Sequence, residues 1–114
     1  MGLSEIFEAT FDRTAVVIHE TAVRKGWWES GDRNFGEIIA LIHCELSEAF
    51  EAYRTGNPAS KKIPAHSQIE EELADVVIRI MDYSAQQGLD LSGAITAKMR
   101  YNTGREYRHG GKVA

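Results

Sequence analysis

Residues 38–54, "IIALIHCELSEAFEAYR", have the spacing of an amphipathic helix whose apolar face contains two carboxylates. At about 100° per residue, one face collects the apolar side chains Ile38, Leu41, Ile42, Ala49 and Ala52. Glu45 falls in the middle of this face, and Glu48 lies about 60° away at its edge. An amphipathic helix normally keeps its acids on the opposite face, so these two carboxylates need a partner or a chemical role.

The composition is that of one globular domain. The chain has 114 residues, of which 43% are hydrophobic and 26% charged, and this suffices for a single core. The formal net charge of −4 argues against a general nucleic-acid binder, which is usually basic. Cys44 has no second cysteine to pair with, no apolar run approaches the roughly 20 residues that span a bilayer, and no signal peptide is recognisable. We therefore expect a cytoplasmic protein that binds neither nucleic acid nor a membrane.

Two long helices are expected on either side of this stretch. The first runs from Ser4, its N-cap, to about Lys25. The other begins after Ser67, which is placed to form a capping box with Glu70, and ends at Gly88. The apolar stripe of the first helix comprises Phe7, Phe11, Ala15, Ile18 and Ala22.

A shorter fourth helix is expected over residues 89–102, followed by a basic tail at 104–114. Short stretches rich in glycine and proline join the helices, and no strand-like alternation of useful length occurs. The predicted fold class is all-α, an antiparallel four-helix bundle. It forms one domain over residues 1–114, in which 1–25 is the N-terminal helix.

The third helix repeats the unusual feature of the second. Its apolar stripe comprises Ile69, Leu73, Val76, Ile80 and Tyr83. Glu72 falls within this stripe and Asp75 lies about 60° beyond it. "ELSE" and "ELAD" therefore each place an i, i+3 carboxylate pair at the margin of a face that should be buried, and antiparallel packing would bring all four acids together.

Four converging carboxylates require a cation. Buried charges without a partner are strongly destabilising, and like charges close together add repulsion. Arg79 is the only basic residue near these faces. Ligands that are all carboxylate oxygens favour a hard divalent ion, so we expect Mg²⁺, with Mn²⁺ as a substitute, bound by Glu45, Glu48, Glu72 and Asp75.

The fourth helix carries a second group of polar residues on its apolar side. Its stripe is Leu91, Ile95 and Met99. Lys98 and Asn102 point the same way, and Arg105 follows if the helix continues. Such a row of donors suits phosphate oxygens, so a metal facing it would form a site for a polyphosphate.

These motifs together resemble the all-α nucleoside triphosphate pyrophosphohydrolases of the MazG-like superfamily. The resemblance rests on "ELSE" followed by "ELAD" in the next helix, on the run "EELADVVIRIMD" and on the ending "KMRYNTGREYRHGGK". It covers roughly residues 24–112. The sequence departs from the family pattern just upstream of the first motif, where His43 and Cys44 stand in place of a frequent further acid.

The resemblance implies Mg²⁺-dependent hydrolysis of a nucleoside or deoxynucleoside triphosphate to the monophosphate and pyrophosphate. Glu45, Glu48, Glu72 and Asp75 would bind the metal, and either Glu48 or Glu45 would activate the attacking water. Lys98, Asn102 and Arg105 correspond to the phosphate-binding end of the family, and Trp28 is a candidate for stacking on the base. Family members assemble as homodimers or homotetramers.

Each of these assignments has a structural alternative. The acids can form a solvated edge of the bundle, the basic row can pair with acids of the third helix, and Trp27 and Trp28 can be core anchors. Two functional alternatives also stand: a sanitiser specific for deoxynucleotides such as dUTP or dCTP, and a helical oligomer that binds metal and nucleotide without cleaving it. No residue identifies the preferred base or sugar.

Overall fold

The computed structural model describes residues 2–105 and contains four helices. They are α1 (Leu3–Arg24), α2 (Phe35–Arg54), α3 (Gln68–Gln87) and α4 (Leu91–Thr103). Over these residues the only β-type pairing is an isolated bridge between Ala59 and Ser67, so the predicted all-α class is confirmed. Beyond Arg105 the predicted basic tail lies outside the described residues. None of the described helices has the length and apolar character needed to cross a membrane.

The ends of α3 were predicted correctly. The Ser67 hydroxyl accepts the Glu70 backbone N–H at 3.1 Å, and the Glu70 carboxylate accepts the Ser67 N–H at 2.8 Å. This is the reciprocal capping box that the sequence indicates. At the other end, Gly88 adopts a left-handed conformation with φ of 64°, which a residue without Cβ tolerates best.

The other helix starts differ from the prediction by a few residues. α1 begins after Gly2, and Ser4 lies inside the helix instead of capping it. α2 begins at Phe35 because the Asn34 side chain accepts the Glu37 N–H at 3.1 Å. α4 begins at Leu91 because Asp90 caps it in the same way. Local side-chain capping therefore fixes the N-terminal ends of α2 and α4.

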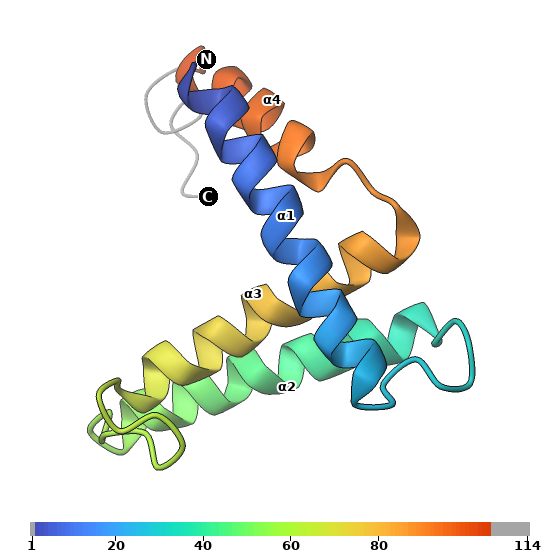
Figure 1. The fold of residues 1–114 in the computed structure, drawn as a ribbon. Coiled ribbons are helices and arrows are strands. Elements are labelled where there is room, and N and C mark those ends of the chain that lie inside the picture. Colours follow the sequence, from blue (N-terminus) through green and yellow to red (C-terminus); the bar gives the residue numbers. More distant parts are fainter. Residues whose placement is uncertain (1, 106–114) are drawn as a thin grey trace.

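The helices form two antiparallel pairs that cross. α2 packs along α3, α1 crosses α3, and α4 lies beside the N-terminal half of α1 (Figure 1). The radius of gyration is 16.7 Å, whereas a compact chain of this length would have roughly 13 Å. The antiparallel pairing of the predicted bundle is thus present, but in an open arrangement.

The apolar stripe of α2 faces α3, as predicted. Ile38 and Ala52 are buried, and Glu45 lies among the half-buried residues of the same face. The buried face of α4 differs from the predicted stripe. Met99 is 61% exposed, whereas Ser92 and Thr96 are buried. The Ser92 hydroxyl donates to Asp12 on α1 at 2.7 Å, so small polar side chains contribute to the docking of α4 beside the half-buried Leu91 and Ile95.

A polar cluster fixes the crossing of α1 over α3. The indole N–H of Trp28 donates to both carboxylate oxygens of Asp82 at 3.1 Å. His19 of α1 approaches the same carboxylate with its Nδ1 at 2.7 Å and meets the Trp28 ring edge-on. Trp28 is only 8% exposed, so this tryptophan anchors the loop between α1 and α2 to α3.

Candidate functional site

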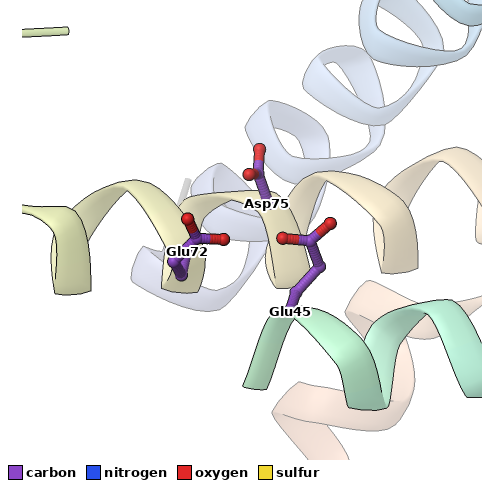
Figure 2. Close-up of side chains that lie close together, drawn as sticks. All are labelled: Glu45, Glu72 and Asp75. Atoms are coloured by element: carbon purple, nitrogen blue, oxygen red, sulfur yellow. The ribbon is translucent and has the colours of Figure 1, made fainter. Parts of the chain in front are cut away.

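Three of the four predicted metal ligands converge between α2 and α3. Figure 2 shows Glu45 of α2 directed toward Glu72 and Asp75 of α3. One carboxylate oxygen from each residue lies within 4.8 Å of the other two, and all three residues are half-buried. The i, i+3 spacing brings Glu72 and Asp75 together on one helix face, and the antiparallel pairing of α2 with α3 supplies Glu45.

Glu48, the fourth predicted ligand, lies at the margin of this cluster. It is exposed and stands outside the group of three. It lines a separate open cavity together with Glu72 and Lys62. Within residues 2–105 no cation forms an ion pair with Glu48, and its carboxylate neighbours those of Glu45 and Glu72.

Crowding of the acids changes their protonation. Burial, followed by the neighbouring carboxylates of Glu45 and Glu48, raises the pKa of Glu72 to about 8. Burial also raises the pKa of Asp75, with further contributions from the charges of Glu45 and Glu71. Both effects disfavour the charged carboxylate. At neutral pH and without a metal, Glu72 therefore retains its proton, which reduces the repulsion within the cluster.

Arg79 compensates the charge of Glu45. Its Nε–H and Nη2–H donate to the same oxygen, Glu45 Oε1, at 3.3 and 3.1 Å. Burial alone would raise the pKa of Glu45, but the contacts with Glu72 and Arg79 outweigh it and lower that pKa. One guanidinium and one proton thus reduce the net negative charge of the cluster.

The cluster fits a hard divalent cation. Glu72 Oε2 is buried and has no hydrogen-bond partner among residues 2–105. An acceptor in this state is destabilising unless a proton or a cation satisfies it. Three carboxylate oxygens from two rigid helices match the ligand preference of Mg²⁺, which usually keeps several waters in addition. Glu45, Glu72 and Asp75 are accordingly the residues that would hold the ion.

A cavity of about 480 Å³ adjoins the carboxylates. Glu45 and Asp75 form part of its wall, and the C-terminal half of α1 and the loop that follows form another part. Four cations line it: Lys25, Arg33, Lys62 and Arg79. Trp27, which is 50% exposed, also lines it and lies within 5.7 Å of both the Arg33 and Arg79 guanidinium groups. The volume falls in the range of small-molecule sites.

The predicted phosphate row lies elsewhere in the chain. Lys98 and Asn102 are exposed on α4, which packs against α1, apart from the N-terminal half of α3 (Figure 1). The Lys98 ammonium lies 4.5 Å from the centre of the Tyr101 ring, and the Arg105 guanidinium lies 5.5 Å from it. Within one chain, the cations that lie near the carboxylates are therefore those that line the cavity, and the α4 residues are not among them.

The structure also distinguishes the two tryptophans. Trp28, the predicted platform for the base, is buried and bonded to Asp82. Trp27 is the more exposed ring and lines the cavity next to the carboxylates. No periodicity in the loop distinguishes these neighbours, because their orientation depends on the crossing of α1 over α3.

Some residues of the site were not assigned a role from the sequence, although a signal was present. Glu72, Asp75, Arg79 and Asp82 stand at i, i+3, i+7 and i+10, which is one continuous face of a helix. This spacing places Arg79 and Asp82 in line with the acids. Lys62 offers no such signal, because a loop holds it: the buried Ser60 hydroxyl accepts the Lys62 backbone N–H and donates to Glu71.

Comparisons with models of known protein families, with curated proteins and with solved structures found no match. The chemistry of the carboxylate cluster and its cavity therefore carries the functional proposal.

Proposed function

We propose that this protein is a nucleoside triphosphate pyrophosphohydrolase of the MazG-like type. It would cleave a nucleoside or deoxynucleoside triphosphate to the monophosphate and pyrophosphate with Mg²⁺. The observation that carries the proposal is the joint position of the cluster and the cavity. Glu45, Glu72 and Asp75 converge beside a cavity lined by four cations, which suits a ligand that carries phosphates and a metal.

Each part of the site has a role in this proposal. Bound Mg²⁺ would neutralise phosphate charge and acidify a water. In the proposed hydrolysis a water oxygen would bond to one phosphorus of the α–β bridge, and the bond from that phosphorus to the bridging oxygen would break, so that the monophosphate and pyrophosphate separate. Glu48 is better suited than Glu45 to take the proton, because Glu45 is one of the three converging acids that would hold the ion. The cations of the cavity would stabilise charge on the departing pyrophosphate.

A substrate panel tests the proposal directly. The pure protein is incubated with each common ribo- and deoxynucleoside triphosphate in Mg²⁺, and pyrophosphate and orthophosphate are assayed separately. We expect pyrophosphate and the monophosphate in equal amounts from at least one substrate, and no release when a chelator is present. Turnover confined to deoxynucleotides such as dUTP or dCTP would favour the sanitiser, and binding without turnover would favour the non-catalytic oligomer. Release of orthophosphate from the γ position would refute the proposal.

We also propose that the chain forms a homodimer or homotetramer, because α2 and α3 expose apolar stripes. On α2 these are Ile39, Leu46, Phe50 and Tyr53, and on α3 they are Leu73, Val77 and Ile80, each 37 to 71% exposed. The α2 stripe adjoins the face that packs on α3, which is typical of a helix with two neighbours in a bundle. A second α2–α3 pair would cover both stripes. In such an assembly, the predicted phosphate row of one copy would be able to lie beside the carboxylate cluster of another copy.

Light scattering tests this assembly. The wild type is expected to have at least twice the mass of one chain, and Phe50→Glu is expected to shift it toward the monomer because it buries a charge in the interface. Val23→Glu changes an apolar residue of similar exposure on α1 and serves as the control. A monomeric wild type would contradict the proposal.

A further inference from the structure

Arg79 stands between the carboxylate cluster and the cavity. Two of its nitrogens donate to Glu45 Oε1, while its side chain is 26% exposed and lines the cavity. The guanidinium also lies 5.7 Å from the centre of the Trp27 ring. It can therefore turn from Glu45 to a ligand in the cavity with little movement of its helix.

A divalent ion and Arg79 compete for the same carboxylate. Arg79 bonds to Glu45, which is one of the three converging acids. An ion held by these acids would repel the guanidinium and withdraw charge from the oxygen that it contacts. An ion bound by the cluster would therefore weaken the Arg79–Glu45 pair.

The released guanidinium would face an anionic ligand. Lys25, Arg33 and Lys62 line the same cavity, and its remaining acid, Asp82, already accepts from Trp28 and contacts His19. Arg33 and Lys62 also lie 3.9 Å from the carboxylates of Glu37 and Glu71, so a divalent ion on Glu45 and Asp75 would leave the cavity wall with a net positive charge. A planar guanidinium binds phosphate through two parallel hydrogen bonds, so an oxygen-rich polyphosphate is the ligand that this wall recognises.

We propose that Arg79 changes partner when metal binds: it neutralises Glu45 in the metal-free protein and binds a phosphate group of the substrate in the metal-bound protein. Metal and polyphosphate consequently bind with positive cooperativity. The inference rests on the proposed function, because it assigns a residue to the phosphates of that same substrate.

Arg79→Gln tests the exchange through two binding measurements of opposite sign. Mn²⁺ alone, titrated by electron paramagnetic resonance, is expected to bind roughly three- to tenfold more tightly to the variant, because the competing cation is gone. A triphosphate analogue with a non-hydrolysable α–β bridge, titrated by calorimetry in saturating Mn²⁺, is expected to bind at least about tenfold more weakly. Inorganic pyrophosphate should lose affinity similarly, because the contact is to phosphate.

Controls separate this inference from the proposed function. Arg54→Gln removes an exposed arginine of α2 that pairs only at the surface with Glu51, and both affinities should stay unchanged. If Arg79→Gln fails to fold, Arg79→Lys replaces it with the same directions and smaller changes. Active wild type in which Arg79→Gln leaves both affinities unchanged, or shifts them in the same direction, overturns the exchange alone. Wild type that binds no Mn²⁺ and releases no pyrophosphate overturns the proposed function and the exchange together.

Discussion

Asp75→Asn is expected to lower pyrophosphate release by more than about a hundredfold while the helices remain folded. Asp75 is one of three acids whose oxygens converge within 4.8 Å, so its loss leaves two charged ligands for the ion. Asparagine keeps the shape of the side chain and removes its negative charge, so the cluster loses one source of repulsion. Steady-state pyrophosphate release, Mn²⁺ titration and circular dichroism measure the three consequences.

Two companion variants make this result specific. Glu48→Gln should also abolish turnover, but it should retain most of the affinity for Mn²⁺ because Glu48 lies outside the converging group. Glu20→Gln removes a carboxylate from the exposed surface of α1 and should leave both quantities unchanged. Unfolding of Asp75→Asn or Glu48→Gln would instead mean that the carboxylate is structural.

Glu72→Gln is expected to stabilise the metal-free protein at alkaline pH and to abolish metal binding. Glutamine resembles the protonated glutamic acid, which is the form that the cluster favours below a pKa of about 8. The variant should melt roughly 3 to 6 °C above the wild type at pH 9 in a chelator. It should also lose the rise in Tm that Mg²⁺ gives the wild type.

The direction of this pH dependence follows from proton linkage. Glu72 has an ordinary pKa of 4.5 in the unfolded chain and about 8 in the folded protein. Between these values the folded state holds a proton that the unfolded state has lost, so the stability of the wild type falls as the pH rises. At pH 5 and below, Glu72→Gln and the wild type should therefore melt at similar temperatures.

Thermal melts from pH 5 to pH 9, with and without Mg²⁺, measure both effects in one experiment. Glu51→Gln provides the matched control, because Glu51 is an exposed acid of α2 that pairs with Arg54. A Glu72→Gln protein that is less stable than the wild type at every pH would show that the charged carboxylate supports the fold.

Much of the candidate site was predictable from residue spacing. The helical positions of Ile38 and Ala52 predicted that Glu45 lies on the buried face of its helix. Both Ile38 and Ala52 are buried in the structure. The i, i+3 relation of Glu72 and Asp75 likewise required only helical geometry. Glu48 was placed with them by the same rule, yet it is exposed at the margin, since a residue 60° from the centre of a face can point to either side.

The sequence by itself determined the four helices and the two carboxylate pairs, because capping, glycine conformation and the helical period act within a few residues. The helical spacing also places Arg79 near these acids, but only the tertiary structure decided which cations from the loops join it. Arg33 and Lys62 lie in loops and reach the cavity through chain packing, whereas Lys98 lies on α4, which packs against α1. The crossing of α1 over α3 buries Trp28 and leaves Trp27 exposed. Such contacts join residues far apart along the chain, and no local preference encodes them.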